Sequence, residues 1–119
     1  MQDEHNAQIF YSHLAKSAPV QRAESSIADI ASDCARYVQV FGQILSTQFG
    51  SDFAPAEAEI NTSLAFQDAL ALALEEENKS MRALVGLLDE VSNAESEKMI
   101  QRVINKKIVN YGLLARLSQ

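Results

Sequence analysis

One carboxylate interrupts an otherwise apolar helical pattern in the second half of the chain. Between Phe66 and Val91, residues recur at alternating steps of three and four, which aligns side chains on one face of a helix. Burying a carboxylate there is unfavourable by several kcal/mol unless it is paired, protonated or bound to a metal. Glu77 is the only member of this pattern that is not apolar: Phe66, Leu70, Ala73, Glu77, Met81, Leu84, Leu88 and Val91.

A plainer interpretation leaves this carboxylate in water. A small rotation of the helix would turn the run Glu75, Glu76 and Glu77 into a solvated acidic edge, as runs of like charge usually are. This helix alone favours the solvated edge. Whether Glu77 is buried therefore depends on the rest of the chain.

The two halves of the chain match each other after a shift of 73 residues, without a gap. The shift superimposes the apolar faces of the predicted helices. It also matches polar positions on those faces, namely Glu4 with Glu77, Cys34 with Lys107, and Tyr37 with Asn110.

Helix-breaking residues divide the chain into four helical segments. Proline disfavours helix at the residue before it, so Ala18-Pro19 ends the first segment. Gly50 and Pro55 interrupt the period in the connection at 48–62. Ser92 and Glu95 have capping-box spacing and open the last segment. The predicted helices span about 2–18, 20–47, 63–91 and 94–117.

Length and composition indicate a single helical domain over 1–119. A chain of 119 residues with 47% hydrophobic residues, four Gly and two Pro can bury a core, and its residue types favour helix. Two antiparallel helical hairpins joined by a long crossover connection predict an all-α, ferritin-like four-helix bundle.

Charge and cysteine content exclude several classes of protein. The net charge of −6 argues against nucleic acid as a partner, because phosphate binding needs clustered Lys and Arg. No apolar run is long enough to span a membrane, and the polar start lacks the form of a signal peptide, so we expect a cytoplasmic protein. One cysteine, Cys34, cannot form an internal disulfide or a cysteine-rich zinc site.

The pattern resembles that of the rubrerythrin and ferritin-like di-iron carboxylate proteins. The run Ala69-Leu-Ala-Leu-Ala-Leu-Glu-Glu-Glu77 is similar to the third-helix pattern that supplies a metal-binding glutamate in that family. Glu4, followed by Ala7 and the pair Phe10-Tyr11, is similar to the first-helix equivalent. The resemblance covers nearly the whole chain and implies two irons held by carboxylates and histidines.

The remaining ligands of that family are missing. Its second and fourth helices each carry Glu-x-x-His, and the resemblance puts those positions at Cys34 and Tyr37 and at Lys107 and Asn110. We therefore expect no metal or other cofactor, with iron as the alternative. If a metal binds, Glu4 and Glu77 would hold it, with Cys34, Asp33 or neighbouring acids completing an altered ligand shell.

Lys107 can take the place of the metal. An ammonium group between Glu4 and Glu77 would neutralise part of their charge and donate three hydrogen bonds. Tyr37 and Asn110 would complete the polar layer. The sequence therefore predicts one buried cluster at these relict positions.

Other candidate residues give weaker signals. Cys34 lies on an apolar face and is expected to be an unreactive core residue. His5 and His13 are eight residues apart, too far for a helical metal pair, and are expected at the surface. The run from His13 to Lys16 resembles the phosphoacceptor helix of histidine phosphotransfer domains, but Ser17 replaces their glycine.

Three functions follow from these patterns. The leading one is a non-catalytic structural, partner-binding or regulatory bundle that has lost its di-iron site, with self-association through helix faces. The second is a metal-binding or oxidoreductase protein with altered ligands. The third is phosphotransfer through His13. No nucleophile with an adjacent base and no phosphate-binding loop indicates other enzyme chemistry.

Overall fold

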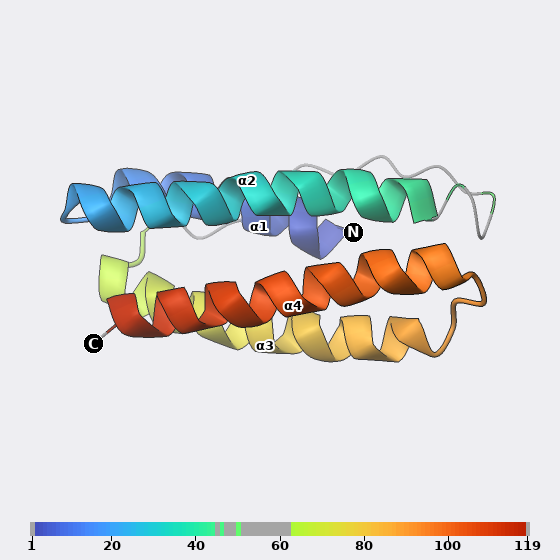
Figure 1. The fold of residues 1–119 in the computed structure, drawn as a ribbon. Helices are drawn as coiled ribbons and strands as arrows, with labels where there is room; N and C mark the ends of the chain where they lie inside the picture. The colour runs from blue at the N-terminus through green and yellow to red at the C-terminus, as the bar shows by residue number, and fades with distance from the viewer. Residues whose placement is uncertain (1, 45, 47–49, 51–62, 119) are drawn as a thin grey trace. The chain divides into compact units, whose positions relative to one another are not determined.

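The computed structural model describes residues 2–44, 46, 50 and 63–118, and its regular structure is entirely helical (Figure 1). No β-strand occurs in these ranges. The all-α prediction is therefore confirmed for this part of the chain. The helices are α1 (Gln2–Lys16), α2 (Gln21–Ile44), α3 (Phe66–Leu88) and α4 (Ala94–Leu117).

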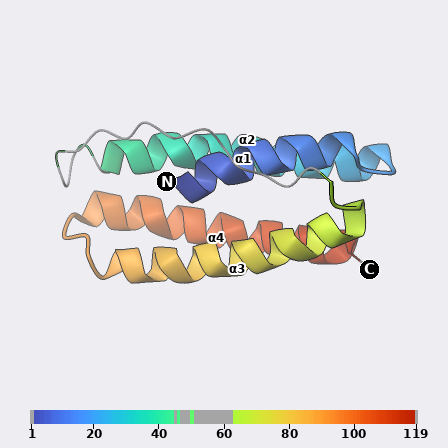
Figure 2. The same cartoon turned by 180° about the vertical axis from the view of Figure 1, so that it is seen from behind.

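The chain divides into two compact units, Met1–Ala69 and Leu70–Gln119. In the first unit α1 lies alongside α2, and in the second unit α4 lies alongside α3, as Figures 1 and 2 both show. Short links at 17–20 and 89–93 reverse the chain within each unit. Each unit is thus built on an antiparallel helical hairpin. The predicted connection at 48–62 lies outside the described residues, apart from Gly50.

The first helix ends two residues before the predicted boundary. The Ser17 backbone N–H donates to the Leu14 carbonyl at 3.1 Å, and the Ser17 hydroxyl donates to the same carbonyl at 2.9 Å. These contacts replace the next helical hydrogen bond. Pro19 then prevents the helix from continuing through Ala18. The prediction of 2–18 is therefore slightly too long.

Helix α3 is also shorter than predicted, whereas the end of the predicted α2 is not fully described. The described part of α2 ends at Ile44, and residues 45 and 47 of the predicted 20–47 lie outside the described ranges. Helix α3 covers 66–88 of the predicted 63–91. It closes with tight turns, in which the N–H groups of Asp89 and Glu90 donate to the carbonyls three residues earlier.

Helix α4 spans 94–117 as predicted, but its cap is a different residue. The side chain of Asn93 accepts hydrogen bonds from the N–H groups of Glu95 at 2.8 Å and Ser96 at 3.2 Å. Asn93 is therefore the N-cap, and the capping box predicted from Ser92 is wrong. Asparagine satisfies the free N–H groups of a first turn as well as serine does, so the shift by one residue costs the helix nothing.

The predicted apolar faces are largely buried. On α2, the residues that recur at steps of three and four are all buried: Ile27, Ile30, Cys34, Tyr37, Phe41 and Ile44. On α1, Tyr11 and Leu14 are buried, and Phe10 packs edge-on against Tyr11 with ring centroids 5.6 Å apart. Ile9 of the same helix is exposed. It precedes the buried Tyr11 by two residues, and a rotation of about 100° per residue therefore puts it on the opposite side of the helix.

None of the described helices combines the length and the apolar composition that a membrane crossing requires.

Candidate functional site

A lysine and a glutamate form a buried ion pair between the helices of the second unit. The Lys107 Nζ on α4 donates a hydrogen bond to the Glu77 Oε2 on α3 at 3.3 Å. Their side chains are only 1% and 4% exposed. Each residue occupies a position of the apolar pattern on its own helix, so the packing of the hairpin draws both charges inward. Glu77 therefore needs a counter-charge, and Lys107 supplies it.

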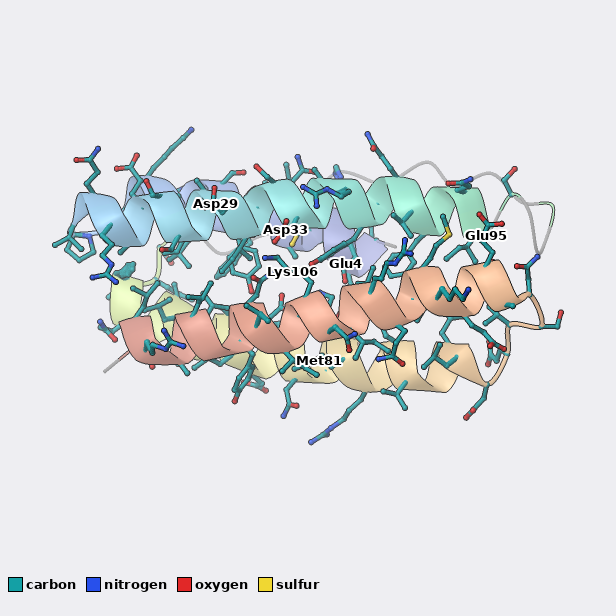
Figure 3. All side chains as sticks on the ribbon, viewed as in Figure 1. Glu4, Asp29, Asp33, Met81, Glu95 and Lys106 are labelled. Carbon is teal, nitrogen blue, oxygen red and sulfur yellow. The ribbon has the colours of Figure 1, made fainter. Side chains whose placement is uncertain are left out.

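The other predicted cluster positions are buried as well. Glu4 lies in the first turn of α1, where the helix dipole favours a negative charge (Figure 3). Asn110 lies one turn after Lys107 on α4. The six positions derived from the internal repeat are between 1% and 4% exposed: Glu4, Cys34, Tyr37, Glu77, Lys107 and Asn110.

The solvated acidic edge accounts for two of the three consecutive glutamates. Glu75 and Glu76 are exposed, and each carboxylate lies within ion-pair distance of the Lys79 Nζ, at 3.6 Å and 3.4 Å. The hydrogen bond to Glu76 and the charges of Glu76 and Glu75 raise the pKa of Lys79. Glu77 faces the opposite way and is buried. The interpretation that places all three glutamates in water is therefore wrong for Glu77.

Asp33 on α2 is a third buried acid. Its carboxylate lies 3.8 Å from the exposed guanidinium of Arg36, one turn further along the helix. Asp29 lies one turn before it on the same helix and is exposed (Figure 3). Next to Asp33, the Cys34 side chain is buried. Cys34 thus lies in the core as predicted, and its slow reaction with thiol reagents stays a prediction.

The two histidines differ in exposure. His13 lies exposed in the last turn of α1, whereas His5 is partly covered. An exposed imidazole is accessible to a phosphate donor, but exposure alone does not distinguish a phosphoacceptor from an ordinary surface histidine. Phosphotransfer through His13 stays a prediction.

The sequence patterns missed one buried polar residue, Ser96. It lies in the first turn of α4, and its backbone N–H donates to the Asn93 cap. The signal was present, because Ser96 precedes the buried Ile100 by four residues and so continues the inward pattern of α4 by one turn.

The geometry of the pair suits a structural role better than catalysis. An ammonium and a carboxylate in contact neutralise each other, and Lys107 has further donors for neighbouring acceptors. Neither side chain reaches the surface, so a dissolved substrate would not meet them. Across 2–44, 46, 50 and 63–118, no group of three or more His, Cys, Asp or Glu side chains is arranged to hold a metal ion.

Comparisons with models of known protein families, with curated proteins and with solved structures find no match to this chain.

Proposed function

We propose that the protein is a ferritin-like four-helix bundle that has lost its di-iron site and acts as a non-catalytic structural or partner-binding protein. In this proposal the two hairpins pack against each other through their apolar faces, with the connection at 48–62 crossing between them. The polar positions of both hairpins then meet in one layer.

The buried pair of Lys107 and Glu77 carries the proposal. In the resemblance to di-iron proteins, Lys107 stands where the fourth helix would supply a metal-binding glutamate. A lysine ammonium repels a cation, and its contact with Glu77 at 3.3 Å uses the carboxylate that the metal would need. A fixed positive charge therefore serves in place of iron.

Iron content tests the loss of the metal site. Protein purified from iron-supplemented cells is expected to hold well under one iron per chain and to lack oxo-bridged di-iron absorption. A variant that restores the missing ligands provides the comparison: Cys34→Glu, Tyr37→His, Lys107→Glu and Asn110→His together. We expect this variant to bind iron. Two tightly bound irons in the parent protein would contradict the proposal.

The meeting of the two hairpins in one polar layer has its own test. A double-mutant cycle between Glu4→Gln and Lys107→Met measures whether the two side chains interact. Residues in one polar network couple by about 0.5–3 kcal/mol, whereas distant residues are additive within about 0.5 kcal/mol. Pairing Lys107→Met with Glu24→Gln, an exposed acid on α2, gives the matched control. If the changes in the free energy of unfolding caused by Glu4→Gln and Lys107→Met were additive, the two side chains would not interact. This result would contradict the ferritin-like arrangement.

A further inference from the structure

Helix α4 has a basic outer face with exposed aliphatic side chains at its centre. Ile108 and Val109 are 58% and 55% exposed, although most large aliphatic residues of the hairpin are covered. Neighbouring exposed aliphatic residues with a charged rim are typical of protein contact surfaces. The α4 outer face lies opposite the buried residues and consists of Lys98, Arg102, Asn105, Ile108, Val109, Gly112 and Arg116.

The charge of this face is opposite to that of the rest of the chain. Of the ten basic residues, five lie between Lys98 and Arg116, and no acid occurs in that stretch. Three of the five, Lys98, Arg102 and Arg116, belong to the α4 outer face, whereas Lys107 is buried against Glu77. The other five basic residues share the remaining chain with all sixteen acids. The α4 outer face therefore suits an acidic surface, and another copy of this chain offers one. The net charge of −6 opposes adsorption of the whole molecule to an anionic lipid surface.

The end of α3 offers a complementary surface. Val85 is 53% exposed, and the exposed acids Asp89 and Glu90 follow it by about one turn. A Cβ added at Gly86 or at Gly112 of α4 would meet nothing within 4 Å. Both helices are therefore open to close approach at these glycines. The α3 outer face consists of Glu75, Lys79, Arg82, Val85, Gly86, Asp89 and Glu90, so its acids lie at its two ends and its two basic residues lie between them.

We propose that the α4 outer face of one copy packs against the α3 outer face of a second copy in a twofold symmetric dimer. A direct contact between two α4 helices would oppose like charges, whereas α3 against α4 brings Arg116 near Asp89 and Glu90 of the other copy. The twofold axis makes this contact twice, because each copy contributes both faces.

The register of this dimer follows from the hairpin. Since α3 and α4 are antiparallel within one copy, a twofold axis perpendicular to them sets α4 of one copy parallel to α3 of the other. If Val109 lies beside Val85, then Arg116 lies within one turn of Asp89, at a rise of 1.5 Å per residue. Arg102 lies within one turn of Glu75 at the other end. Arg102 also lies beside Lys79, which contacts Glu75, and about one turn from Arg82, so the complementary charges are concentrated at the Arg116 end of the contact.

Sedimentation equilibrium on the full chain tests the proposal. We expect a reversible monomer–dimer equilibrium that weakens with added salt, because exposed charges are screened beyond about 10 Å at 0.1 M salt. Arg116→Glu should raise the dissociation constant about tenfold. Arg22→Glu makes the same change of charge at an exposed position of α2 and should leave the constant unchanged. Val109→Glu should abolish the dimer.

Exchanging the charges of Arg116 and Asp89 distinguishes a specific contact from a change in folding or in net charge. Asp89→Lys should weaken the dimer as Arg116→Glu does, and the two changes together should restore it, with circular dichroism checking the fold of each variant. A parent protein that stays monomeric, or equal effects of Arg116→Glu and Arg22→Glu, would overturn the proposal. Binding to phosphatidylserine vesicles in place of self-association would overturn it as well. The iron content does not depend on the dimer, so either proposal can fail alone.

Discussion

Two lysine–glutamate contacts on the same hairpin show how burial changes the role of an ion pair. Lys79 contacts Glu75 and Glu76 on the surface of α3, at distances of 3.6 Å and 3.4 Å. Lys107 contacts Glu77 in the interior at 3.3 Å. The distances are nearly equal, but the Lys79 side chain is 62% exposed and the Lys107 side chain only 1%.

Water accounts for the difference between these contacts. Around Lys79 the solvent screens the charges and would solvate them equally well if the pair separated. Around Lys107 no solvent takes the place of a lost partner, so each charge depends on the other. We therefore expect the surface contact to be dispensable and the buried pair to be required as a unit.

Removing the buried ammonium should have the largest effect. Lys107→Met leaves the Glu77 carboxylate without its counter-charge, and breaking a buried pair in this way typically costs about 3–5 kcal/mol. Chemical denaturation of both proteins at pH 7 measures the change in the free energy of unfolding. Lys79→Met is the matched control. Equal stability of the Lys107→Met variant and the parent would show that the pair is not buried in solution.

Removing both charges should recover much of that loss. In the variant with Glu77→Gln and Lys107→Met no buried charge is left, and replacing a whole buried pair is often nearly neutral. We expect the double variant to unfold within about 1–2 kcal/mol of the parent protein. If it were as unstable as Lys107→Met alone, the lost packing of the lysine chain would explain the damage, and not the unpaired charge.

Lowering the pH should partly restore the stability of the Lys107→Met variant relative to the parent protein. Burial without a counter-charge favours the protonated acid, so the folded variant binds a proton more readily than the unfolded chain. The penalty is therefore largest at neutral pH and shrinks as the pH falls toward the ordinary range of a glutamate. Denaturation at pH 7 and pH 5 should show a smaller deficit relative to the parent at pH 5. A deficit independent of pH would exclude the carboxylate as its source.

The surface contact should show the smallest effect. Glu76 and Glu75 raise the pKa of Lys79 above its ordinary value of 10.5, so any stabilisation is fully present below that value and is lost only as the pH rises through the higher folded pKa. The Lys79→Met variant and the parent protein should have nearly the same melting temperature at neutral pH, with and without added salt. A clear destabilisation by Lys79→Met would remove the contrast with Lys107.

Local sequence signals predicted the helices well but located several of their ends poorly. The apolar period and the Ser92–Glu95 spacing together placed α4 at 94–117, and Pro19 separated α1 from α2. The ends depend on single hydrogen bonds instead. Ser17 closes α1 early through the Leu14 carbonyl, and Asn93 caps α4 where Ser92 was expected. Serine and asparagine are both good N-cap residues, so N-cap preference does not determine which of the adjacent Ser92 and Asn93 caps the helix.

The sequence by itself determined which faces of the helices turn inward, because the spacing of apolar residues is a property of each helix alone. It also identified Glu77 and Lys107 as charges on such faces. Only the tertiary structure decided that Glu77 is buried while Glu75 and Glu76 stay in water. The period of α3 tolerates a small rotation that would expose all three acids. What opposes that rotation is an ammonium on another helix, thirty residues further along the chain, whose Nζ lies 3.3 Å from the Glu77 carboxylate.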